Sequence, residues 1–83
     1  MNTYPSSTSQ ISRPTLQTGD TGNDVMELQK LLSQQGPDTP VDGNFDSTTL
    51  AAVISFQQRK GLLVDGIVGP KTWAVLQGSE AQE

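Results

Sequence analysis

Four aspartates are the residues of this 83-residue sequence that come closest to catalytic chemistry. Asp38, Asp42, Asp46 and Asp65 would offer the pair of carboxyl groups that glycoside cleavage requires. The sequence has no histidine and no cysteine, so the commonest general base and the thiol nucleophile are both missing. The aspartates stand near glycines or before expected helices, where they serve turns and helix caps. We therefore predict no enzymatic activity and no catalytic residue.

The spacing Asp42-x-Asn44-x-Asp46 places oxygen ligands at alternating positions, as a calcium-binding loop does. An EF-hand loop that begins at Asp42 requires glycine where Ser47 stands and glutamate where Val53 stands. Both requirements fail. The sequence therefore predicts a turn here, with no metal ion and no cofactor.

The side chains that could bind a ligand each have a second, structural interpretation. Trp73 could stack on a sugar ring, or it could pack against Leu50 where two helices meet. Gln57 and its equivalent Gln29 could bind an amide or N-acetyl group, or they could hydrogen bond a loop of this chain. Arg59 could pair with a ligand carboxylate or with the negative end of a helix dipole. We predict a shallow ligand-binding site formed by Asn44, Leu50, Ile54, Gln57, Arg59 and Trp73.

Three segments show helical periodicity and must position these side chains. The first expected helix spans residues 24–35, capped at its start by Asn23 or Asp24. Gly36 is expected to end this helix in the left-handed conformation. One apolar face of the helix follows the i, i+3, i+7 spacing, with Val25, Leu28 and Leu32.

The second expected helix spans residues 47–60 and the third spans residues 70–77. Asp46 is expected to cap the second helix and Gly69 the third, and Gly61 closes the second. The buried face of the second helix is formed by Thr49, Ala52, Val53 and Phe56. The third helix has about two turns, so it depends on packing against the other two.

A unit of turn plus helix occurs twice, at an offset of 23 residues. Residues 41–53 read VDGNFDSTTLAAV and residues 64–76 read VDGIVGPKTWAVL, which are identical at five of thirteen positions. Each copy opens on an Asp-Gly turn, in which glycine supplies a positive φ and aspartate bonds the backbone two residues on. We expect these structural loops to be formed by Asp42, Gly43, Asp65 and Gly66. The apolar side chains expected to anchor the loops in the core are Val41, Phe45, Val64 and Val68.

Composition sets the expected domain boundaries. Residues 1–15 are rich in Ser, Thr and Pro and are expected to form a flexible lead-in, residues 16–77 the domain, and residues 78–83 a polar tail. No signal peptide or membrane-spanning segment is expected. The net charge of −4 argues against nucleic acid or an anionic membrane as the main partner. The absence of heptads and long strands predicts a monomer.

A long pattern of spaced glycines, apolar residues and glutamines runs through the expected domain. It begins Leu16-x-x-Gly19-x-x-Gly22-x-x-Val25-x-x-Leu28-Gln29-x-x-Leu32, passes through both Asp-Gly loops and ends Thr72-x-x-x-Leu76. This pattern resembles the peptidoglycan-binding-domain-like family, a three-helix module found beside cell-wall amidases, carboxypeptidases, transpeptidases and transglycosylases. One departure is Asp46 after Phe45, where the family usually has glycine.

The resemblance implies an all-α fold, a compact orthogonal three-helix bundle that binds peptidoglycan without catalysis, through its glycan or its stem peptide. It also implies a catalytic domain as a partner, in the same or another chain, and a location in the cell envelope, in the periplasm or outside the cell. Because no signal peptide is recognised, the sequence leaves a cytoplasmic location open. The alternative on the same fold is a protein-interaction or pro-region docking module, for which a patch at Leu50 and Ile54 is suited.

Overall fold

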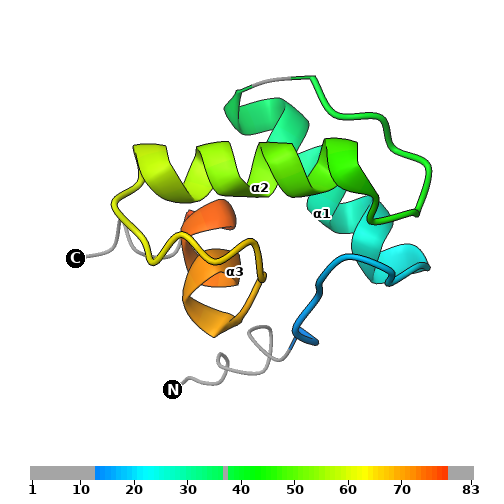
Figure 1. The fold of residues 1–83 in the computed structure, drawn as a ribbon, viewed down its shortest axis with the longest axis horizontal. Coiled ribbons are helices and arrows are strands. Elements are labelled where there is room, and N and C mark those ends of the chain that lie inside the picture. Colours follow the sequence, from blue (N-terminus) through cyan, green and yellow to red (C-terminus); the bar gives the residue numbers. More distant parts are fainter. Residues whose placement is uncertain (1–12, 37, 79–83) are drawn as a thin grey trace, which may run out of the picture.

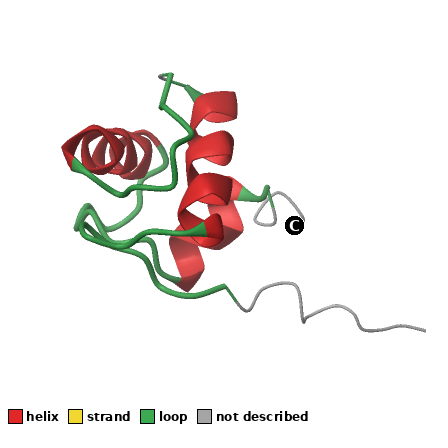
Figure 2. Ribbon diagram, turned by 90° about the vertical axis from the view of Figure 1, so that its right-hand side faces the viewer, coloured by secondary structure: helices red, strands yellow, loops and turns green. Residues whose placement is uncertain are grey.

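The computed structural model describes residues 13–36 and 38–78, which form three α-helices. Helix α1 spans Asn23–Gln35, α2 spans Ser47–Arg59 and α3 spans Pro70–Leu76. Helix α1 packs against both α2 and α3, and α2 runs across α1 in two views taken at right angles (Figures 1 and 2). The predicted all-α three-helix bundle is confirmed.

Between the helices, the described part of the chain has no strand, only isolated bridges. These join Leu16 to Val68 and Thr21 to Asn44, so the segment before α1 touches both Asp-Gly loops. None of the helices found in residues 13–36 and 38–78 has the length and apolarity that crossing a membrane requires.

The core lies where the predicted apolar faces of α1 and α2 meet α3. Both predicted faces are confirmed, since every residue assigned to them is at most 6% exposed. The buried apolar residues are Leu16, Val25, Leu28, Leu32, Phe45, Ala52, Val53, Phe56, Val68, Trp73 and Leu76. Burial of this apolar set provides the main force that holds the short helices together.

The anchoring of the two loops differs in part from the prediction. Phe45 and Val68 are 2% and 0% exposed, as expected, but Val41 and Val64 are 41% and 45% exposed. The expectation that these valines enter the core is wrong. Each valine precedes the Asp-Gly turn, and only the residue beyond the turn faces the helices.

The helix ends follow the predictions at α2 and α3. The Asp46 side chain accepts hydrogen bonds from the backbone N–H groups of Thr48 and Thr49, and Gly69 precedes α3 as its N-cap. Gly61 has a φ of +71°, the left-handed conformation expected after α2. Helices α2 and α3 each end one residue before the predicted position.

Both ends of α1 differ from the prediction. The helix starts at Asn23 with Gly22 as its N-cap and no side-chain cap, because one earlier residue joins the first turn. Gly36 has a φ of 177°, which is extended backbone and not the left-handed conformation. The guanidinium group of Arg59 lies close to this glycine, since a Cβ atom built at residue 36 would lie 2.6 Å from Nη2 of Arg59.

Residues just before the predicted domain boundary pack against the domain. The Arg13 guanidinium lies 5.1 Å from the centroid of the Trp73 ring, and the Pro14 carbonyl accepts a 2.8 Å hydrogen bond from the indole N–H. The packed chain therefore includes Arg13 and Pro14, which precede residue 16. The rest of the expected lead-in, residues 1–12, and tail residues 79–83 lie outside the described residues.

Candidate functional site

Gln29 on α1 holds the first Asp-Gly loop. Its side chain is 1% exposed, and its Oε1 accepts hydrogen bonds of 2.9 Å from the backbone N–H groups of Asp42 and Gly43. Its Nε2 donates to Asp42 Oδ1, to the Asn44 carbonyl and to Thr49 Oγ1, each at 3.0 Å. One neutral side chain thus satisfies several backbone groups of a turn that lies outside the three helices.

Gln57 on α2 holds the second loop in the same way. Its Oε1 accepts from the N–H groups of Asp65 and Gly66, at 3.2 and 3.0 Å. Its Nε2 donates to Asp65 Oδ1, to the Ile67 carbonyl and to Thr72 Oγ1. The internal repeat is therefore a repeat of hydrogen bonds as well as of letters. Gln57 is 1% exposed, so the structure shows the loop-bonding interpretation of this residue.

The loop aspartates serve the turns as predicted. Asp42 Oδ1 accepts from the Asn44 N–H at 3.0 Å, and Asp65 Oδ1 accepts from the Ile67 N–H at 2.9 Å. These backbone bonds, followed by the glutamine bonds, hold the pKa of both carboxyl groups below their ordinary value. A carboxyl group with a lowered pKa stays ionised near neutral pH and is unsuited to act as a general acid.

Trp73 occupies the core and not the surface. Its side chain is 0% exposed, so the ring offers no face on which a sugar could stack. Leu50 and Ile54 are partly buried against the second loop, since a Cβ atom at Gly66 would lie 2.6 Å from the Leu50 side chain and 3.8 Å from that of Ile54. Trp73 is thus a core residue and Leu50 packs against the core, whereas Ile54 is partly buried beside Gly66.

Arg59 joins the ends of two helices. Its Nη1 donates to the Gln35 carbonyl at 3.3 Å, so the cation lies at the negative C-terminal end of α1. Asn44 is exposed, but it precedes α2 whereas Arg59 ends it, and a 13-residue helix is about 20 Å long. The structure therefore does not bring the six predicted site residues together at one surface.

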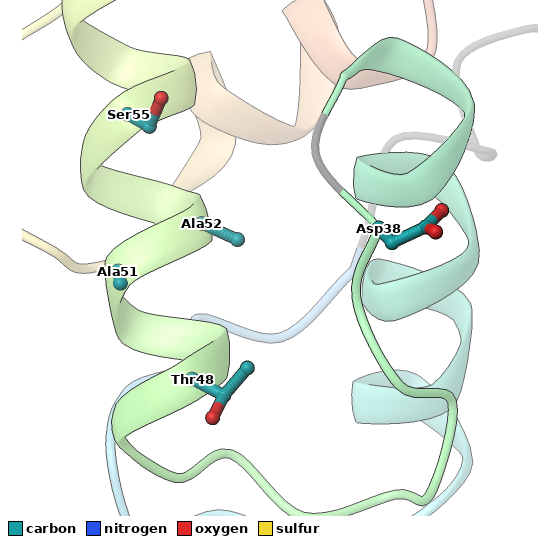
Figure 3. A pocket seen from close by; sticks show the side chains of 5 residues that line it. All are labelled: Asp38, Thr48, Ala51, Ala52 and Ser55. Atoms are coloured by element: carbon teal, nitrogen blue, oxygen red, sulfur yellow. The ribbon is translucent and has the colours of Figure 1, made fainter.

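A hollow lies beside α2, on a different face from the one that carries Leu50 and Ile54. This groove of about 310 Å³ opens between α2 and the segment that follows α1 (Figure 3). It is lined by Asp38, Thr48, Ala51, Ala52 and Ser55. The α2 residues follow the spacing i, i+3, i+4, i+7 and so share one face, whose short side chains leave the space open.

Asp38 forms the opposite wall of this groove. It is exposed, and in Figure 3 its carboxylate is directed away from α2, at the rim of the hollow. From the sequence, Asp38 is considered only as an acid, Ala52 is assigned to the buried face of the second helix, and the other lining residues are assigned no role. The signal that could have found them is the run of small residues at helical spacing beside the buried face.

Comparisons with known proteins agree with this architecture. The family described as "Putative peptidoglycan binding domain" matches residues 21–76. An uncharacterized protein of Kitasatospora aureofaciens is 48% identical in an alignment of 75 positions that covers 86% of this chain and 62% of that protein. The N-acetylmuramoyl-L-alanine amidase CwlL of Bacillus licheniformis is 39% identical in an alignment of 84 positions that covers 94% of this chain and 23% of the amidase.

A solved structure extends the match to three dimensions. The SleB N-terminal domain superposes with a TM-score of 0.77 at 42% identity, covering 82% of this chain and 94% of that domain. The chain thus spans less than two thirds of the curated relatives above but nearly all of one solved domain. The matched residues include both glutamine-held loops and all three helices. This chain therefore belongs to the family of peptidoglycan binding domains.

Proposed function

We propose that this domain is a non-catalytic module that binds bacterial peptidoglycan and attaches an associated activity to the cell wall. The observation that supports this most directly is membership of the family over residues 21–76. The groove on α2 supplies an open surface for the ligand, because its lining residues other than Ala52 are not part of the hydrophobic core. We propose this groove, in place of the six residues selected from the sequence, as the contact site.

The residues of this chain lack the usual catalytic groups. The sequence provides no histidine and no cysteine, and hydrogen bonds hold the carboxylates of Asp42 and Asp65 in their turns. A binding module benefits a tethered activity by raising its effective concentration at the wall, so weak binding is sufficient. The proposal places the domain, as a monomer, in the cell envelope beside a catalytic domain.

Co-sedimentation with purified sacculi tests the proposal. We expect the wild-type domain to sediment with sacculi in a saturable manner. Ala51→Phe fills the groove from an exposed position, so we expect about tenfold weaker binding, equivalent to about 1.4 kcal/mol. Gln58→Phe adds the same ring at an exposed α2 position that does not line the groove.

The two variants separate loss of the site from loss of the fold. Gln58→Phe is expected to bind sacculi as the wild type does, and both variants are expected to keep the helical circular dichroism spectrum. Equal binding by Ala51→Phe and Gln58→Phe would remove the groove from the proposal. A wild-type domain that stays in the supernatant would remove the function itself.

One observation favours docking on a protein as a second candidate function. Leu63 is 80% exposed and Ile67 is 37% exposed, on the same segment between α2 and α3. This segment covers part of the predicted patch at Leu50 and Ile54. The exposed apolar side chains of this region therefore belong to the segment itself. Leu63→Ser distinguishes the candidates, because wall binding through the groove survives this change and docking through this segment does not.

A further inference from the structure

We infer that the groove on α2 receives the stem peptide of peptidoglycan and not its glycan, at a stretch with small side chains and a free primary ammonium group. This inference rests on the proposed function and adds to it the chemical class of the ligand. Three features carry it: the placement of the aromatic rings, the size of the lining side chains and the charge around the groove.

The aromatic rings argue against a sugar as the bound group. Phe45, Phe56 and Trp73 are the aromatic residues of the described chain, and they are 2%, 0% and 0% exposed. A sugar ring gains most of its apolar contact by stacking on an exposed aromatic face. In residues 13–36 and 38–78 no such face borders the groove, so a glycan would lose its usual platform.

The lining of the groove suits a peptide. The exposed methyl group of Ala51, beside the nearly buried Ala52, provides a shallow apolar surface that matches small aliphatic side chains such as those of alanine. The hydroxyl groups of Thr48 and Ser55 lie on the same face, where they can both donate to carbonyl groups and accept from amide N–H groups. A short peptide backbone presents these two partners at every residue.

The charges select for a cation and against an anion. Asp38 is the one ionisable residue that lines the groove, and none of the five lysines and arginines does so. The ion pair found among the described residues joins Arg13 to Asp24, so Asp38 is not neutralised by it. An ammonium group on the peptide therefore gains from the rim of this groove.

Three soluble probes, followed by amide chemical shifts of the 15N-labelled protein, test the inference. The first is a tripeptide of alanine, glutamate and lysine with a blocked amino terminus and a free ε-amino group. The second is the same peptide with the ε-amino group acetylated, and the third is the disaccharide of the glycan without peptide. We expect saturable shifts at Thr48, Ala51 and Ser55 with the first probe. Acetylation should weaken binding about two- to fivefold, the range of an exposed charge pair.

Two charge variants assign this effect to its residue. Asp38→Asn should remove the preference for the free amine, whereas Glu27→Gln, which removes a charge from α1 away from the groove lining, should keep it. The inference is overturned if the disaccharide shifts the groove amides more tightly, or if acetylation changes nothing. It is also overturned if no probe shifts them although the domain sediments with sacculi, and in that case the proposed function stands. Failure to sediment marks the failure of the proposed function.

Discussion

At the residue scale, the molecule depends on two glutamines that no hydrophobic pattern explains. Gln29 and Gln57 are each 1% exposed and each bind one loop through both the carbonyl and the amino group of the side chain. Glutamate would keep the acceptor but lose the donors, and it would face the loop carboxylate. A neutral side chain with a donor and an acceptor is therefore required at both positions.

We expect the stability of the two loops to depend on pH. Asp42 and Asp65 have folded-state pKa values below the ordinary 3.8, so their contribution to stability is present above that pH. The contribution is lost as the pH falls through the folded-state pKa values. Asp42→Asn keeps the side-chain oxygen but not the charge. We expect urea denaturation to show that the wild type is more stable than Asp42→Asn at pH 7. The gap, which is the difference between their free energies of unfolding, should shrink below pH 3.8. A gap that is constant from pH 7 to pH 2 would contradict this account.

At the scale of elements, the second Asp-Gly loop and α2 are fitted to each other. Gly66 is buried with a φ of +74°, and the position of its missing Cβ lies 2.6 Å from the Leu50 side chain. Gly61 has a similar φ of +71°, but nothing lies within 4 Å of its missing Cβ. The two glycines share a backbone requirement and differ in the space around them.

This difference predicts unequal costs for the same substitution. Gly61→Ala should lower the free energy of unfolding by about 1–2 kcal/mol, the cost of the left-handed conformation. Gly66→Ala should cost about 1 kcal/mol more, because the new methyl group displaces Leu50. In a Leu50→Ala background the extra cost should vanish, which denaturant unfolding of the four variants would measure. Equal costs at Gly61 and Gly66 would show that Leu50 yields freely.

At the scale of the whole molecule, the chain before α1 closes the bundle. Leu16 is 5% exposed and exchanges backbone hydrogen bonds with Val68, at 3.1 and 2.9 Å. Just before it, the Pro14 carbonyl binds the indole N–H of Trp73 on α3. These contacts join residues more than 50 positions apart, so they tie the first described segment to the last helix.

The family match begins at residue 21, whereas the buried residues begin earlier in the chain, with Leu16. A substitution outside the matched range should therefore have a large effect on stability. Leu16→Ala should lower stability by about 2–4 kcal/mol through the loss of buried area and the cavity left behind. For a chain of this size the melting temperature should fall by at least about 8 °C. The neighbouring exposed Gln17→Ala should change stability by less than about 0.5 kcal/mol. Thermal unfolding followed by circular dichroism would compare them, and similar melting temperatures would contradict the closing role of Leu16.

The sequence by itself determined the three helices, their buried faces and the repeated loop. Helical periodicity, the Asp46 cap and the Asp-Gly turns are local features, because each depends on residues within about one turn of one another. The long spaced pattern also identified the family, since a small core and its turns restrict many positions at once.

Only the tertiary structure decided which side chains are available to a ligand. Trp73 is buried because a segment 59 residues away in the chain supplies its hydrogen-bond acceptor. The Arg59 side chain lies beside Gly36 although the two residues belong to different segments, and the groove exists because Asp38 lies opposite the small residues of α2. Exposure and concavity arise between elements that are distant in the sequence, and helical periodicity describes only one element at a time.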